Sequence, residues 1–306
     1  MTNAHWNRRE VLAAATAFGL APLAGLGQQA SMTRRRIPAA AENETLPIIG
    51  LGTYEVFDVP GDADAIAERR RIVQMLIDAG GSVIDTSPMY NRSERVIGDI
   101  MASGIPRGPL FLATKVWTDG REGGIAQMRE SAALMRTEVI DLMQVHNLRD
   151  TEVHMPVIRE FQEEGFIRYS GLTHYRADAL SDLEAEMRFF RPEFIQINYS
   201  LGEREADDHI LPLAADVGIA VIVNRPFQGG ALFSAVRGRE LPAWAAEFAG
   251  SWGQFFLKFI VSHPAITCAI PATSNPEHMR DNLEAGFGAL PDAETRQRMI
   301  DFVENL

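Results

Sequence analysis

Four side chains in the first half of the chain could carry out proton transfer together. Asp85, Lys115 and His146 each end a short apolar run, and Tyr90 stands five residues beyond Asp85. A buried carboxylate is costly unless it is paired, so we expect Asp85 to have a cationic partner. A carboxylate, an ammonium, an imidazole and a phenol that converge make a proton-transfer site. The alternative interpretation is three unrelated strand-end residues, one of them in an ion pair.

The elements that must bring these side chains together are short apolar strands that alternate with longer segments of helical period. Nearly continuous apolar runs are typical of parallel strands covered on both faces by helices. Eight such units predict a single-domain (β/α)8 TIM barrel over residues 31–306, in which all strand-end loops share one face. We predict strands at residues 48–54, 82–86, 110–115, 142–146, 169–174, 194–199, 220–225 and 266–271, helices at residues 62–79, 93–102, 123–138, 153–164, 177–190 and 203–217, and a long loop at residues 229–248. An open doubly wound sheet is the alternative, but residues 50–53 lack the third glycine of a dinucleotide fingerprint.

A phenol beside an ammonium can act as a general acid. The reference pKa of tyrosine is about 10, and a neighbouring cation lowers this pKa because it stabilises the phenolate. We therefore expect Tyr90 to be the general acid, Lys115 to lower its pKa and Asp85 to hold Lys115. His146 would donate a hydrogen bond that orients a substrate oxygen, and Trp117 would line the site or fill the core. The set suits protonation of a carbonyl oxygen as hydride reaches the carbon, and the hydride has to come from a cofactor because no side chain supplies one.

The segments around these residues resemble the aldo-keto reductase family. The resemblance extends from about Ile37 to Asn282. It is carried, in order, by LPIIGLGTY at 46–54, DTSPMY at 85–90, ATKVW at 113–117, DLMQVHN at 141–147, GLTHY at 171–175 and IPATS at 270–274. Each segment alone is weak evidence, whereas their order and spacing are specific. The resemblance implies that Asp85, Tyr90, Lys115 and His146 are the catalytic tetrad of an oxidoreductase that reduces a carbonyl compound with a nicotinamide dinucleotide.

By this resemblance the cofactor is NADPH, with NADH as the alternative, and the substrate is a small-molecule aldehyde or ketone. The residues assigned to the cofactor are Gly52, Thr53, Tyr54, Asp85, Thr173, His174, Gln196, Arg225, Phe227, Gly229, Thr273, Ser274, His278 and Asn282, and those assigned to the substrate are Trp117 and Tyr54. The chain ends at Leu306, soon after its last helical segment, so we expect an open substrate site.

This chain departs from the family pattern at both ends of the expected cofactor. His174 stands where the family usually has Asn, and the Asn-Arg pair at 224–225 stands where many members have Tyr-Ser and stack the tyrosine on the nicotinamide. We expect Arg225 or Phe227 to supply the flat surface on which the nicotinamide stacks. Ala272 and His278 stand where relatives that prefer NADPH have Lys and Arg, so we expect only a modest preference for NADPH.

Composition limits the classes of partner. The formal net charge of -12 argues against nucleic acid or an anionic membrane surface, because either partner would require a basic face. The seven histidines are scattered along the chain, so no metal site is predicted. Cys268 is the single cysteine and lies in an apolar run, where we expect a buried thiol rather than a nucleophile.

Residues 1–30 differ from the rest of the chain. Arg8 and Arg9 precede a run at 13–26 dominated by Ala, Leu and Gly, and Ala30 offers a small residue near a cleavage point. The segment resembles a cleavable twin-arginine signal, which implies that the twin-arginine export machinery carries the protein, folded with its cofactor, to the periplasm or out of the cell. The alternative is a basic pair ahead of an Ala-rich amphipathic helix. No other segment approaches the ~18 apolar residues that span a bilayer, so no membrane anchor is predicted.

Two other functions remain open from the sequence. A nucleotide-binding redox sensor or partner-binding protein would keep the cofactor site with little turnover, although an intact tetrad argues for turnover. A barrel hydrolase would need two carboxylates on opposite sides of one bond. Besides Asp85, the obvious strand-end acid is Glu55, and its position next to the expected ribose site does not fit that role.

Overall fold

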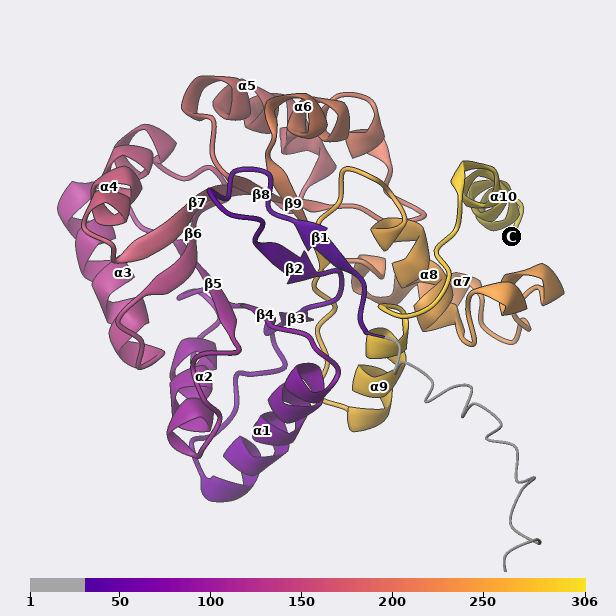
Figure 1. The fold of residues 1–306 in the computed structure, drawn as a ribbon, viewed down its shortest axis with the longest axis horizontal. Helices are drawn as coiled ribbons and strands as arrows, with labels where there is room; N and C mark the ends of the chain where they lie inside the picture. Colours follow the sequence, from indigo (N-terminus) through magenta and orange to yellow (C-terminus); the bar gives the residue numbers. More distant parts are fainter. Residues whose placement is uncertain (1–30) are drawn as a thin grey trace, which may run out of the picture. The chain divides into compact units, whose positions relative to one another are not determined.

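The protein, described by a computed structural model at residues 31–306, has a barrel of eight parallel strands that pair in chain order (Figure 1). The predicted signal at residues 1–30 lies outside the described residues. The strands are β3 (Leu51–Gly52), β4 (Val83–Asp85), β5 (Phe111–Val116), β6 (Ile140–His146), β7 (Ile167–Thr173), β8 (Phe194–Asn198), β9 (Ala220–Asn224) and β10 (Cys268–Ala269). Backbone bridges pair Ile49 with Ala269 and Gly52 with Ala272, which brings the first and last strands together. The predicted (β/α)8 barrel is confirmed.

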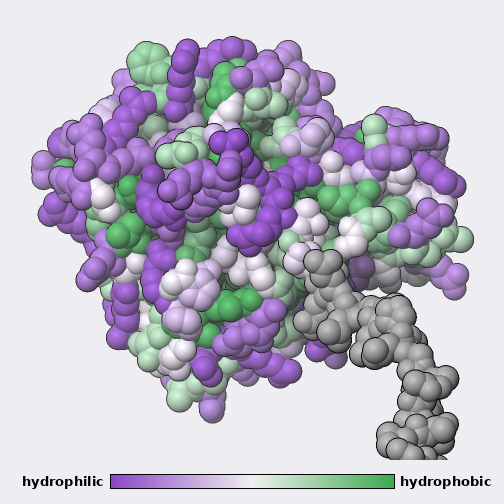
Figure 2. Space-filling view, in the orientation of Figure 1, coloured by the Kyte–Doolittle hydropathy of each residue, from purple (hydrophilic) through white to green (hydrophobic). Residues whose placement is uncertain are grey.

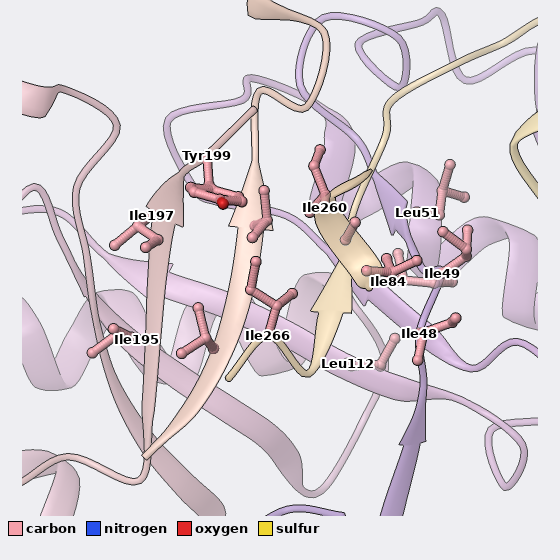
Figure 3. Packing of buried hydrophobic residues seen from close by; sticks show 14 of the residues in the cluster. Ile48, Ile49, Leu51, Ile84, Leu112, Ile195, Ile197, Tyr199, Ile260 and Ile266 are labelled. Atoms are coloured by element: carbon pink, nitrogen blue, oxygen red, sulfur yellow. The ribbon is translucent and has the colours of Figure 1, made fainter. Parts of the chain in front are cut away.

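Successive side chains of each strand point to opposite faces of the sheet, and this produces two separate apolar cores. The smaller core lies inside the barrel, where the rings of Phe111, Tyr169 and Phe194 pack with centroids 5.3 to 6.1 Å apart. Side chains of the opposite orientation, such as Leu112 and Ile195, pack in the larger core, part of which is shown in Figure 3. Strands β5 and β6 are buried along their whole length. A polar side chain in these strands therefore needs a partner within the protein.

Helices surround the barrel (Figure 1). They are α1 (Ala63–Asp78), α2 (Ser93–Ala102), α3 (Arg121–Leu134), α4 (Thr151–Glu163), α5 (Leu180–Phe190), α6 (Ile210–Val217), α7 (Ala231–Ala235), α8 (Trp252–Val261), α9 (Pro276–Glu284) and α10 (Ala293–Glu304), with short 3-10 segments η1 (Ala177–Ala179), η2 (Glu205–Asp207), η3 (Gln228–Gly230) and η4 (Ala243–Glu247). Helix α2 has the predicted bounds.

Two predictions between β8 and α8 were wrong in part. The helix predicted from residue 203 begins only at Ile210, because a backbone bridge between Ser200 and Glu203 turns the chain first. The loop predicted at residues 229–248 contains α7 and η4, which are too short to show a clear helical period.

A hairpin that the sequence did not predict adds to the smaller core (Figure 1). Its strands β1 (Arg34–Arg36) and β2 (Thr45–Pro47) pair antiparallel. Ile37 and Leu46, at the two sides of the hairpin, are buried in the core inside the barrel. Arg35 donates hydrogen bonds to backbone carbonyls at the end of α8 and in the segment after it. Three consecutive arginines show no apolar alternation, so the sequence gives no sign of the strand, which pairing with β2 defines and the long-range bonds of Arg35 hold in place.

The surface in Figure 2 is mostly polar, with small scattered apolar areas. Tyr54 and Tyr175 are among the large apolar side chains that remain exposed, at 53% and 45% of their surface. Within residues 31–306, no helix is long and apolar enough to cross a bilayer.

One buried acid lies between the barrel and its helices. Glu94, in the first turn of α2, is 1% exposed and accepts a hydrogen bond from Thr114 Oγ1 at 2.5 Å. Burial raises the pKa of Glu94, against the opposing effects of Thr114 and Lys115. The folded state therefore favours the neutral acid more than the unfolded chain does. The stability that this provides is lost as the pH rises through the folded-state pKa.

We predict that Glu94→Gln increases the free energy of unfolding at about pH 8 by about 1 kcal/mol, because an amide replaces a buried charge. The gain should shrink at about pH 5, because a lower pH favours uptake of a proton by the wild-type acid. Urea unfolding at both pH values measures the difference. Glu163→Gln is the control, since it removes the same charge from an exposed position of α4. A Glu94→Gln protein less stable than wild type at the higher pH would contradict the prediction.

Candidate active site

The barrel places three of the four predicted catalytic residues at the carboxyl ends of adjacent strands. Asp85 ends β4, Lys115 is the penultimate residue of β5, and His146 ends β6. Tyr90 lies in the loop between β4 and α2. Because neighbouring parallel strands end at the same rim of a barrel, these four residues share one face of the protein.

The centre of the site is a buried ion pair. Lys115 Nζ lies 2.7 Å from Asp85 Oδ1, and the two residues are 0% and 3% exposed. Lys115 also donates a hydrogen bond to Thr86 O at 2.7 Å. Gln144 Nε2 and Gln196 Nε2 donate to the other carboxylate oxygen of Asp85, at 3.2 and 2.8 Å. The sequence analysis missed Gln144, although it stands two residues before His146 and so points to the same side of β6.

Lys115 is a cation in this environment. Burial alone lowers the pKa of Lys115, but the charges of Asp85 and Tyr90 and their hydrogen bonds outweigh burial, so the pKa is raised. A cation that cannot lose its proton at neutral pH is a permanent source of positive charge for its neighbours.

Tyr90 lies close to the positive charge of Lys115. Lys115 Nζ is 5.2 Å from the centroid of the Tyr90 ring. Burial raises the pKa of Tyr90 and Asp85 adds to the increase, while Lys115 acts in the lowering direction. The predicted lowering of this pKa was therefore wrong, because the loss of solvent outweighs the cation. The consequence is a phenol that keeps its proton at neutral pH and can donate it.

His146 is a neutral imidazole. Burial, and then the positive charges of Lys115 and His174, lower the pKa of His146 to about 2. Its Nδ1 lies 3.0 Å from Ser87 Oγ, a contact that the sequence analysis missed. A neutral ring can donate only one hydrogen bond, so the tautomer of His146 decides what it can do.

Aromatic rings stand around the catalytic side chains. Tyr54 packs edge-on against Tyr90 with centroids 5.0 Å apart, and Trp117 lies 6.3 Å from the ring of His146. The guanidinium of Arg149 packs over Trp117, 5.2 Å from the centroid of its ring. The two residues predicted to contact the substrate therefore stand beside the two rings predicted to act on it.

The residues predicted near the nicotinamide form a connected layer. Thr173 Oγ1 donates to Gln196 Oε1 at 3.2 Å, and Gln196 in turn holds Asp85. Thr53 Oγ1 donates to the backbone carbonyl of Asp85 at 2.9 Å. At Gly52 a Cβ atom would meet the backbone oxygen of Ile270 at 2.8 Å, so only glycine lets the first and last strands approach this closely.

A second cluster lies on the β7 and β9 side of the rim. His174 and Tyr175 stack with parallel rings 5.7 Å apart, and the Arg225 guanidinium packs over Tyr175 at 5.8 Å. Tyr175 was part of a motif in the sequence analysis but was not assigned to the site. Phe227 and Gly229 follow on the same loop, where Gly229 has a φ of 63°.

The residues predicted for the adenosine end follow β10. Thr273 Oγ1 accepts a hydrogen bond from the backbone of Asn275, which caps α9. Ser274 and His278 are exposed, and Asn282 is buried. These residues belong to a different element from the tetrad, and the bridge between Gly52 and Ala272 connects their loop to the strand that pairs with Asp85.

Unpaired amide oxygens test whether this rim suits a nicotinamide dinucleotide. Buried side-chain oxygens of Asn147, Asn198 and Asn224, at the ends of β6, β8 and β9, have no hydrogen-bond partner among residues 31–306. Buried polar atoms are normally satisfied, so these oxygens fit a ligand that brings its own donors, such as a carboxamide or ribose hydroxyls. The same part of the chain contains no group of three His, Cys, Asp or Glu side chains that could hold a metal ion.

Comparison with known proteins identifies the family. The family model described as the aldo/keto reductase family matches residues 48–298, which is most of the chain. The chain belongs to the aldo/keto reductase family. An aldo-keto reductase of Bombyx mori is 26% identical over 267 residues, which cover 79% of this chain and 84% of that protein. The NADH-specific methylglyoxal reductase of Escherichia coli is 28% identical over 247 residues, with 69% and 73% covered.

Solved structures have the same fold as this aldo/keto reductase. The Bacillus halodurans aldo-keto reductase in its holo form has a TM-score of 0.71 at 21% identity, over 89% of this chain and 96% of that one. The Bombyx mori aldo-keto reductase in complex with NADP has a TM-score of 0.69 at 22% identity, over 89% and 93%. An aldo-keto reductase of Klebsiella pneumoniae in complex with NADPH has a TM-score of 0.68 at 21% identity, over 89% and 96%.

We predict that Lys115→Met lowers the free energy of unfolding by about 3–5 kcal/mol, because it leaves Asp85 as an unpaired buried charge. Adding Asp85→Asn should recover part of this loss, since the second substitution removes the uncompensated charge. Urea unfolding of both single variants and the double variant measures the coupling. Arg136→Met breaks an ion pair at the surface and is the control with little expected effect. Additive losses in the double variant would contradict the prediction.

Proposed function

We propose that this protein reduces an aldehyde or ketone to the alcohol, with Tyr90 as the general acid and NADPH as the hydride donor. The observation that carries the proposal is the ring of Tyr90, whose centroid lies 5.2 Å from the buried Nζ of Lys115 and 6.0 Å from the ring of His146. No hydrolytic reaction needs this set, whereas a carbonyl reduction needs one proton at oxygen for each hydride at carbon.

The protein's side chains divide the proton chemistry among them. The substrate oxygen accepts a hydrogen bond from His146 and then the proton of Tyr90, while hydride forms the new C–H bond. The phenolate that remains is stabilised by Lys115 and regains a proton from solvent. Asp85 holds Lys115 in position and keeps the buried pair neutral overall. Donors that the folded protein holds in place before the substrate binds reduce the reorganisation that the reaction requires.

The residues support a dinucleotide as the hydride source. NADPH, when bound, supplies the hydride, and the unpaired amide oxygens at the ends of β6, β8 and β9 offer acceptors for its carboxamide and ribose. Gln196 in β8 and Thr173 at the end of β7, which are hydrogen-bonded to each other, add further polar groups. The names of relatives support the same class of cofactor, since one structure holds NADP, one holds NADPH and one relative is called NADH-specific.

We predict that Tyr90→Phe lowers kcat for carbonyl reduction by about 10²- to 10⁴-fold, because it removes the hydroxyl that carries the transferable proton. Fluorescence titration should give an unchanged Kd for NADPH. Tyr169→Phe is the matched control, because it removes a phenol whose partner is Glu44 and not a residue of the tetrad. Oxidation of NADPH against a panel of aldehydes measures the rates. A Tyr90→Phe enzyme within about threefold of wild type would refute the assignment, and bound NADPH without turnover in wild type would favour a redox sensor.

We predict that NADPH binds more tightly than NADH by a modest margin that decreases with salt. Ala272 provides no charge for the 2'-phosphate, so recognition depends on the hydroxyls of Thr273 and Ser274 and on Arg280 in α9. Exposed charges of this kind are screened within about 10 Å at roughly 0.1 M salt. Ala272→Lys should tighten binding of NADPH and leave the Kd of NADH unchanged.

The measurement is the ratio of the two dissociation constants at low and high salt for wild type and for Ala272→Lys. Ala272→Gln is the control for the added length without the charge. A preference for NADH, or a large NADPH preference that salt does not change, would show that this end of the site recognises the cofactor differently.

We also propose that residues 1–30 direct twin-arginine export to the periplasm or beyond. The proposal is supported by Arg8 and Arg9 ahead of a short apolar run. Arg8→Lys with Arg9→Lys should leave the protein in the cytoplasm, measured by cell fractionation. Arg34→Lys with Arg36→Lys is the control, because this pair lies beyond the segment. An unchanged location of the Arg8/Arg9 variant would rule out this route.

A further inference from the structure

Ser87 is a buried residue of the site that is not a member of the catalytic tetrad. It lies in the loop between β4 and α2, between Asp85 and Tyr90, and it is 0% exposed. Its Oγ is 3.0 Å from His146 Nδ1. A hydroxyl and an imidazole nitrogen at this distance share one hydrogen, and which of the two donates it depends on their other partners.

The partners of the hydroxyl decide the direction. Ser87 Oγ accepts a hydrogen bond from the backbone N–H of Met89 at 3.3 Å. Among residues 31–306, the remaining hydrogen-bond partner of this side chain is Nδ1 of His146, so the Ser87 hydroxyl proton has only that nitrogen as its acceptor. Buried donors are rarely left without an acceptor. The bond therefore runs from the Ser87 hydroxyl to Nδ1.

The direction of this bond determines the tautomer of His146. As a neutral imidazole it carries a single N–H, and a lone pair at Nδ1 places that hydrogen on Nε2. The opposite tautomer would leave the Ser87 hydroxyl without an acceptor. It would also present a bare Nε2 lone pair, which repels the lone pairs of a carbonyl oxygen.

We infer that Ser87 is a positioning residue that fixes His146 as the Nε2–H tautomer and aims this N–H at the substrate oxygen. The edge-on contact with Tyr90 at 6.0 Å and the Trp117 ring at 6.3 Å restrict rotation of the imidazole, so the aim is maintained. The tautomer follows from the folded chain alone. The statement that this N–H points at the substrate oxygen rests on the proposed function.

Nitrogen NMR of protein labelled with 15N-histidine tests the tautomer without substrate or cofactor. In wild type, Nδ1 of His146 should have the shift of an unprotonated ring nitrogen and Nε2 that of a protonated one, between about pH 5 and 8. His146→Gln assigns the signals. Ser87→Ala should move Nδ1 toward the protonated shift, and Ser87→Thr, which keeps the hydroxyl, should restore the wild-type pattern. A protonated Nδ1 in wild type, or a Ser87→Ala spectrum equal to that of wild type, would overturn the inference.

Kinetics test the consequence for the reaction. Ser87→Ala should lower kcat by about 10- to 100-fold, less than the loss of an oxyanion donor itself, with the Kd of NADPH unchanged. Thermal unfolding of the same sample shows whether the variant is folded, and Ser87→Thr should recover kcat. A changed tautomer with an unchanged kcat would overturn the role of Ser87 in the reaction. If wild type reduced no aldehyde or ketone, the proposed function would fail while the NMR result still decided the tautomer.

Discussion

The ion pair of Asp85 and Lys115 is the interaction on which the rest of the site depends. Both residues are buried, and two ions without solvent are stable only if every remaining donor and acceptor is satisfied. Gln144 and Gln196 supply the missing hydrogen bonds from β6 and β8. Four of the eight strands thus contribute a side chain to this pair or to its hydrogen bonds. The pair in turn sets the electrostatics of Tyr90 and His146, because each of them lies close to the cation.

The loops around this pair have an unusual backbone. Most of the non-glycine residues with positive φ lie at the carboxyl ends of strands, on the face of the site: Glu55, Asn91, Asn147, Leu148, Asp150, Arg225 and Gln228. A side chain in this conformation costs free energy, which the rigid barrel beneath has to offset. The barrel contributes that stability through two apolar cores on either side of its strands. The same architecture therefore supplies stability below the rim and strained, well-defined loops above it.

The site combines family features with a departure of its own. Asn224 stands at the end of β9, where many members have a tyrosine, and its buried oxygen has no partner in the part of the chain from residue 31 onward. Aromatic surface is instead present in the neighbouring stack of His174, Tyr175 and Arg225. An acceptor at β9 and a ring at β7 can together present the polarity and the flat surface that a nicotinamide requires, in a different arrangement from a single tyrosine.

The sequence by itself determined the order of the elements and the residue types at the strand ends. Burial on both faces makes each strand a continuous apolar run, so β6 could be predicted. Asp85, Lys115 and His146 stand out because each is a polar residue at the end of such a run. The family segments added the roles of these residues. The hairpin of β1 and β2 was not predictable, because three consecutive arginines show no apolar alternation and the side chain of Arg35 is held by carbonyls more than two hundred positions away.

Only the tertiary structure decided which groups touch and how their charges balance. The pKa of Tyr90 is raised because solvent is excluded from it, and no spacing of residues reveals how much water reaches a ring. The bond between Ser87 and His146 joins residues 59 positions apart, and its direction depends on a backbone N–H at Met89. Local patterns define elements because periodicity is local, whereas desolvation and hydrogen-bond direction depend on every neighbour in space.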